Sequence, residues 1–178
     1  MQTQNLIETN TEFKNIIQPL ITNDTVQEMK NYRQHFDVSC FEHSYLAAFY
    51  CYLICKKLRL DYKSATRAAM LHDLFLYDWR DKNSHHRFHA FHHGKTACQN
   101  ACKLFDLTKK EQDIIIRHMW PVTFAFPTSI EGLILTFVDK YCALQESFKS
   151  LKLQAYSKRA FRYAYLFLGL LVFNIKQI

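Results

Sequence analysis

The sequence predicts an all-α protein, and three observations lead to this fold class. The chain has 178 residues but only three glycines and three prolines, so few positions favour tight turns. It shows neither an alternating β-hairpin pattern nor an internal repeat, and we expect five or more helices with no sheet beyond an incidental pair of residues. Four segments match the capping box, in which a Ser or Thr and a Glu three residues later satisfy the free amides of a helix's first turn. These segments begin at Thr9, Ser39, Thr108 and Thr128.

The composition indicates a single cytoplasmic domain formed by residues 1–178. Apolar residues make up 49% of the chain, enough for one complete core. The six cysteines lie within helical patterns and no secretory signal is recognised, so we expect reduced thiols packed in the core. Two pairs spaced like zinc ligands, Cys51 with Cys55 and Cys98 with Cys102, are the less favoured alternative. The net charge of +7 suits a polyanionic partner, but there is no strong nucleic-acid signal, because no block of Lys and Arg is present.

The first part of the chain is expected to form two short helices and one long central helix. The first begins near Glu12, breaks near Pro19 and covers the core with an apolar stripe; the second spans residues 25–33. Residues 40–58 are apolar around most of the helix circumference, which predicts a central position, with His43 in the first turn. The apolar stripe consists of Phe13, Ile16, Ile17 and Leu20.

Asp61 is expected to cap the next helix, which ends at the adjacent pair His72 and Asp73. Small and apolar residues precede this pair, and such a helix does not need two polar groups to fold. Leaving either group buried and unpaired costs a few kcal/mol. We interpret the pair as metal ligands, although a satisfied buried hydrogen bond explains an isolated His-Asp dipeptide about as well.

A polar segment reaching to about His89 is the one long irregular stretch. Long loops in compact domains are often functional. We interpret His85 and His86 as solvent-exposed, whereas His89 lies four residues before His93 and shares its face if the following helix begins early. Other side chains of this stretch that can meet a substrate are Tyr77, Asp78, Trp79 and Arg80.

Three further helices are expected over residues 95–105, 109–118 and 128–148. Pro121 ends the second, because proline disfavours helix at the residue before it. Asp139 lies on the apolar face of the third, where a carboxylate is either a metal ligand or paired with a basic residue.

The last segment, residues 161–178, is strongly apolar but too short to cross a membrane. Only 13 uncharged residues separate Arg162 from Lys176, fewer than the ~17 to 25 of a spanning helix. We expect a buried closing helix, with a homodimer contact or an interfacial anchor as alternatives.

The ordered series of a histidine, a His-Asp pair, two histidines and an aspartate resembles the HD-domain superfamily of metal-dependent phosphohydrolases. The resemblance covers about residues 35–146 and implies a helical bundle around the metal site. It implies that one metal is held by His43, His72, Asp73 and Asp139. A second metal would use His93, His118 and again Asp73. Imidazoles together with carboxylates suit Mn, Fe, Co, Ni or Zn, so we expect one or two divalent transition metal ions per chain.

The resemblance also implies the chemistry, which is hydrolysis of a phosphoester of a small molecule by a metal-activated water, with a nucleotide as the expected substrate. We expect Asp73 and Asp78 to be catalytic, with Asp78 as the general acid/base. The chain has Leu76 and Tyr77 where nucleotide- and alarmone-cleaving members place acids. Two alternatives share these ligands: an HD-fold di-iron oxygenase, and a regulatory nucleotide-binding protein with a metal site. The expected substrate-binding residues are His35, His89, Lys95, Arg117 and Lys140.

Overall fold

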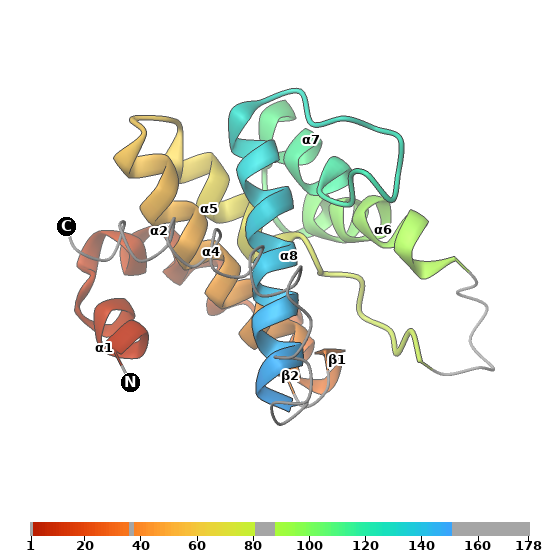
Figure 1. Cartoon of the computed structure of the whole chain (residues 1–178), viewed down its shortest axis with the longest axis horizontal. Helices are drawn as coiled ribbons and strands as arrows, with labels where there is room; N and C mark the ends of the chain where they lie inside the picture. The colour runs from red at the N-terminus through yellow and green to blue at the C-terminus, as the bar shows by residue number, and fades with distance from the viewer. Residues whose placement is uncertain (1, 36–37, 81–87, 151–178) are drawn as a thin grey trace, which may run out of the picture.

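The computed structural model describes residues 2–35, 38–80 and 88–150, and within these ranges the protein is all-α (Figure 1). Two very short strands, β1 (Arg33–His35) and β2 (Val38–Ser39), pair antiparallel, as expected for an incidental contact. The described helices are α1 (Gln2–Thr9), α2 (Thr11–Ile21), α3 (Asp24–Gln27), the 3₁₀ helix η1 (Glu28–Asn31), α4 (Cys40–Lys57), α5 (Tyr62–Leu71), α6 (His89–Leu104), α7 (Lys109–Arg117) and α8 (Ile130–Ser150). None of the described helices is both long and apolar enough to cross a bilayer.

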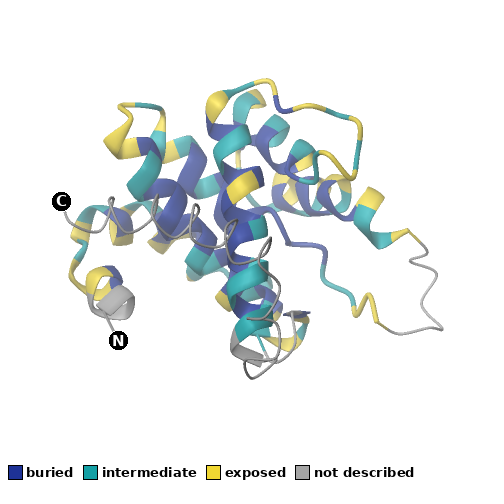
Figure 2. Ribbon diagram, viewed as in Figure 1, coloured by how far each residue is buried: buried dark blue, intermediate teal, exposed yellow. Residues whose placement is uncertain are grey.

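Helix α4 is the centre of the bundle, as its sequence predicts. It packs against both α5 and α8, and Figure 1 shows α8 crossing the middle of the molecule. The five consecutive residues 48–52 are all buried. Successive residues of a helix are about 100° apart, so five of them cover its whole circumference. Figure 2 shows the same pattern, with buried residues where the helices face one another and exposed residues at the turns.

Two of the four predicted capping boxes are confirmed and two are wrong. Ser39 caps α4 together with Glu42, and Thr108 caps α7 together with Glu111. Thr9 instead ends α1, and the Asn10 side chain caps α2 by accepting from the amide of Phe13. At the start of α8 the capping contact comes from the Ser129 hydroxyl, which accepts from the amide of Gly132 at 3.1 Å. The Thr128 hydroxyl does not cap this helix but donates to the carboxylate of Asp113 at 2.5 Å. In both failures a competing cap lies one residue further along the chain.

The predicted N-terminal helices need three corrections. Helix α1 was not expected, and α2 continues past Pro19 to Ile21, because Pro19 lies in the last turn and the amide of Thr22 still bonds to Gln18. The helix expected over residues 25–33 stops being α-helical after Gln27 and gives way to η1 and β1. The apolar stripe of α2 is confirmed, since three of its members are fully buried: Phe13, Ile17 and Leu20.

The cysteines are free thiols, and most are buried as predicted. Burial raises the pKa of Cys55 to about 12 and also raises that of Cys51, which opposes formation of a thiolate pair for zinc. Cys102 departs from the prediction, because it is exposed near the end of α6.

Helix α6 begins at His89, six residues earlier than predicted, and therefore contains both His93 and Gly94. Gly94 is where α6 meets α7 most closely. A Cβ atom at this position would lie 3.0 Å from the carbonyl oxygen of Ile115 and 3.2 Å from the ring of His118. Glycine therefore lets the two helices approach closely enough for His93 and His118 to meet.

We expect Gly94→Ala to lower the free energy of unfolding by about 1 to 3 kcal/mol, because the added methyl group meets backbone that cannot move aside. Helix propensity alone would give the opposite sign, a gain of about 1 kcal/mol. Thermal or urea unfolding measures the difference, with the neighbouring exposed Lys95→Ala as a control that should change little. A more stable Gly94→Ala protein would contradict the close contact.

Candidate metal centre

The six predicted ligands come from distant parts of the chain and converge in the interior. All are buried, between α4, α5, α6, α7 and α8. Two of them directly follow a helix: His72 after α5 and His118 after α7. Their ligand atoms form two groups, and within each group all atoms lie within 4.8 Å of one another. The first group is His43, His72, Asp73 and Asp139; the second is Asp73, His93 and His118.

The first group is built around two carboxylates. The Nε2 atom of His43 lies 3.0 Å from Oδ1 of Asp139 and 3.9 Å from Oδ2 of Asp73. The Nε2 atom of His72 lies 3.3 Å from the same Asp73 oxygen and 3.6 Å from Oδ1 of Asp139. Two imidazoles and two carboxylates thus face a common point, as in a first-row transition-metal site.

The second group uses the other oxygen of Asp73. Its Oδ1 atom lies 3.3 Å from Nε2 of His93 and 3.9 Å from Nε2 of His118. The two imidazole nitrogens are 2.9 Å apart. Asp73 therefore presents one oxygen to each group, as required of a carboxylate that bridges two metal ions.

Backbone carbonyls set the tautomer of three of these histidines. The Nδ1–H of His72 donates to the carbonyl of Ala69, that of His118 to Ile115 and that of His93 to His89, at 2.7 to 3.0 Å. A neutral ring that donates from Nδ1 carries only a lone pair on Nε2, which is the form that binds metal.

Lone pairs that face one another in the interior require a cation or a proton between them. In the described structure Nε2 of His72 and Oδ1 of Asp73 are buried without a hydrogen-bond partner. Burial, together with the neighbouring His93 and His72, lowers the pKa of His118 to about 3, so this ring is neutral. Burial opposes the charge of Asp73, but the surrounding histidines lower its pKa overall, so the carboxylate is ionised. The residues present thus fit a dinuclear metal site of the kind that the sequence predicts.

The structure adds Glu146, which the sequence interpretation missed. Both of its carboxylate oxygens lie 3.0 Å from Nδ1 of His43. Burial lowers the pKa of His43, but hydrogen bonds to Asp139 and Glu146 outweigh it and raise the pKa to about 10. Such a carboxylate orients a metal-binding histidine and increases its basicity. A signal existed in the sequence, since Glu146 follows Asp139 by seven residues and so shares its helix face.

Gln34 is a second residue that was missed, and for it the sequence held no signal. It lies in β1 and its Nε2 donates to Oδ2 of Asp73 at 2.5 Å. Its Oε1 accepts from the thiol of Cys40 at 3.4 Å. Gln34 thereby holds the bridging carboxylate in place from outside the helical bundle.

Two of the predicted substrate-binding residues line a cavity of about 340 Å³ beside the ligands. Lys140 donates from Nζ to the carbonyls of His118 and Thr136, and burial lowers its pKa. His89 bonds through Nδ1 to the Tyr77 hydroxyl at 2.9 Å and stacks on the ring of His93. The cavity is lined by Gln34, Trp79, His89, Ala90, His93, His118, Met119, Val122, Asp139, Lys140 and Ala143.

The other predicted site residues are not among the described residues that line this cavity. Asp78 is exposed, and its carboxylate accepts from the amide of Arg80 at 3.0 Å. Arg117 pairs with Asp113 and donates to the carbonyl of Phe126, while Lys95 is exposed on α6. The side chain of His35 lies outside the described residues, as do His85, His86 and the apolar segment 161–178 with its expected dimer contact.

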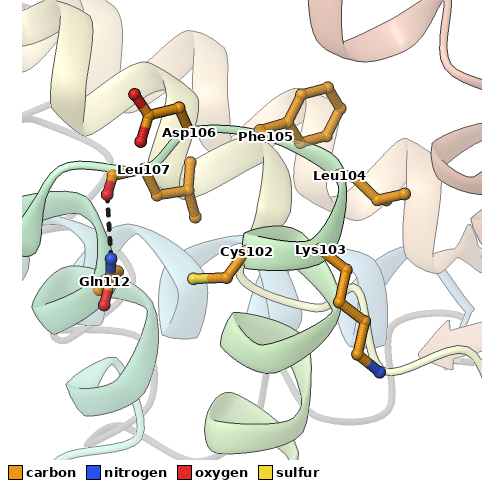
Figure 3. Close-up of a pocket in the computed structure, with 7 residues that line it drawn as sticks. All are labelled: Cys102, Lys103, Leu104, Phe105, Asp106, Leu107 and Gln112. Carbon is orange, nitrogen blue, oxygen red and sulfur yellow. Dashed lines mark hydrogen bonds between the residues drawn. The ribbon is translucent and has the colours of Figure 1, made fainter.

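A second hollow, of about 440 Å³, lies at the turn between α6 and α7 (Figure 3). Its wall includes Cys102 and Lys103, and Gln112 donates to the carbonyl of Leu107 across it. It contains none of the six predicted ligands. The cavity beside the ligands is therefore the better candidate for substrate binding, although it is the smaller of the two.

Comparison with known proteins gives one family match. A family model described as an HD domain matches residues 25–163, which include all six predicted ligands. No curated protein matches the chain, and no solved structure matches it.

The shared carboxylate leads to a prediction of metal stoichiometry. We expect two metal ions per chain in the wild-type protein, none in Asp73→Ala and one in His118→Ala, because only Asp73 belongs to both groups. Elemental analysis of the purified proteins measures this. One ion per wild-type chain, unchanged by His118→Ala, would refute the dinuclear site.

Glu146 leads to a second prediction. We expect Glu146→Gln to weaken metal binding by about 10- to 100-fold, because His43 loses the carboxylate that orients it and increases its basicity. Titration against a chelator measures the affinity, and Gln145→Ala, a change at the preceding residue of α8, is the matched control. Equal affinities in the two variants would show that Glu146 does not act on the metal site.

Proposed function

The chain belongs to the HD-domain family, and we propose on this premise that it is a metal-dependent phosphohydrolase. Its substrate would be a phosphoester of a small molecule, and nucleotides are the first class to test. The observation that carries this proposal is the buried pair of ligand groups that share Asp73. A binding protein without catalysis would not need two converging groups of lone pairs beside a cavity.

The reaction that we propose is hydrolysis of the phosphoester by a metal-activated water. When bound, a metal pair withdraws charge from the phosphoryl group and activates a water for attack on phosphorus. The bond between phosphorus and the ester oxygen breaks, and the products are an alcohol and inorganic phosphate. No serine or cysteine of the chain lies in a nucleophile-elbow sequence, and a metal-activated water can supply the nucleophile instead.

The protein's own residues hold the reacting groups in place. Gln34 and the histidines fix Asp73, and Glu146 fixes His43. Lys140 uses two N–H groups on backbone carbonyls, so its third can donate to a phosphoryl oxygen at the cavity wall. A positive group that is already anchored loses little conformational entropy when phosphate binds.

The main test is phosphate release from a panel of nucleotides and other phosphoesters by protein loaded with Mn or Fe. We expect turnover by the wild type and none by His72→Ala, which loses a ligand of the first metal group, with helical content unchanged by circular dichroism. If loaded protein releases no phosphate from the panel yet consumes O₂ with an organophosphonate or a polyol, the same ligands serve di-iron redox chemistry instead. If the loaded protein shows neither activity, the result favours a regulatory binding protein.

Asp78 is our predicted general acid/base. Its side chain is exposed and bonds to the amide of Arg80, so a substitution can be tested with little effect on the core. If its carboxylate leaves the amide of Arg80, accepts a proton from the attacking water and donates it to the ester oxygen of the leaving group, Asp78→Asn should lower kcat by about 10²- to 10⁴-fold. The amide keeps the acceptor oxygen that bonds to Arg80, so the turn should be preserved. Activity close to that of the wild type would limit Asp78 to this structural contact.

A further inference from the structure

The cavity beside the metal ligands has a largely apolar wall, which phosphate chemistry itself does not require. Apart from the ligands, its polar lining residues are Gln34, His89 and Lys140. The other lining residues are Trp79, Ala90, Met119, Val122 and Ala143.

Apart from the third N–H group of Lys140, the polar groups of this wall make hydrogen bonds or ring contacts within the protein. Both ends of the Gln34 amide are hydrogen bonded, and two N–H groups of Lys140 donate to carbonyls. Trp79 stacks with the His89 ring at 5.4 Å, so that ring face is covered. A sugar or a nucleobase buried here would leave polar groups without partners, at a cost in free energy.

The apolar surface continues from the cavity to the outside. Val122 lines the cavity and is 42% exposed, and the same loop between α7 and α8 carries Phe124, which is 99% exposed. Ala90 also lines the cavity, and Phe91, the next residue of α6, is 52% exposed. An apolar cavity wall that is partly exposed, as at Val122, is suited to the hydrocarbon part of a ligand.

The side chains beyond the metal ligands favour a substrate with one phosphoryl group. Lys140 is the only lysine or arginine among the described residues that line the cavity, and the metal ions would lie at the ligand groups at one end. The further phosphates of a di- or triphosphate would lie against the apolar wall, away from these positive charges.

We propose, resting on the phosphohydrolase function above, that the substrate is an amphiphilic phosphomonoester. Its phosphoryl group lies at the ligand groups and Lys140. Its hydrocarbon body lies against Met119 and Val122 of the cavity wall.

The experiment uses the metal-loaded protein and n-alkyl phosphates from ethyl to octyl. We expect kcat/KM to rise about fourfold for each added CH₂, the gain expected from burying one methylene group. Adenosine monophosphate and glucose 6-phosphate, whose bodies are polar, should be poorer substrates than octyl phosphate. A second experiment measures binding without turnover, by calorimetry with alkylphosphonic acids under argon. The binding affinity should depend on chain length in the same way as kcat/KM.

A matched pair of variants locates the hydrocarbon site. Val122→Ser should lower the preference for octyl over ethyl phosphate by about tenfold, whereas Leu58→Ser should leave it unchanged. Leu58 is also exposed, at 57%, but lies at the end of α4 and does not line the cavity. If Val122→Ser shows the same chain-length dependence as the wild type, the assignment of this wall as the hydrocarbon site is overturned.

The outcomes separate the two proposals. Phosphate release with no dependence on chain length, or with the nucleotide as the better substrate, overturns the amphiphile and leaves the phosphohydrolase intact. Chain-length-dependent binding of the phosphonic acids without phosphate release from any ester overturns the phosphohydrolase and leaves the ligand class standing.

Discussion

The Asp73 carboxylate is the group on which the rest of the structure depends. Burial opposes its charge, yet one oxygen faces His43 and His72 and the other faces His93 and His118. An ionised carboxylate is stable in a protein interior only when opposite charge or hydrogen bonds compensate for the lost water. The side chains around it come from helices α4, α6 and α8, from the residues that directly follow α5 and α7, and from the strand β1, so the arrangement of the bundle and that of the candidate metal centre are set together.

Backbone carbonyls at two helix ends orient two of the histidine ligands. The last carbonyls of a helix have no partner within it. At the ends of α5 and α7 such carbonyls, those of Ala69 and Ile115, accept from Nδ1 of His72 and His118 and leave Nε2 directed at the centre. Gly94 then lets α6 come close enough to α7 for His93 to join them.

The cavity combines a charged inner end with an apolar wall, as ligand-binding pockets commonly do. Its inner end has a carboxylate, imidazoles and the buried Lys140, whereas its wall includes Trp79, Met119 and Val122. Charged chemistry and an apolar body of the substrate would thus be handled by different elements: the helical core for the first and the loop between α7 and α8 for the second.

The sequence by itself determined the fold class and most helices, because apolar periodicity and caps such as Ser39 and Asp61 are local features. The six residues that meet in the interior were identified through the resemblance of their order to the HD-domain superfamily. Only the tertiary structure decided that α6 begins before His93, that Gln34 and Glu146 support the ligands, and that Lys140 lines the cavity while Arg117 pairs elsewhere. Arg117 pairs with Asp113 four residues before it, but the contacts of Gln34 with Asp73, of Glu146 with His43 and of Lys140 with the carbonyl of His118 join residues far apart in the chain. Their geometry depends on how the helices pack, which no local pattern specifies.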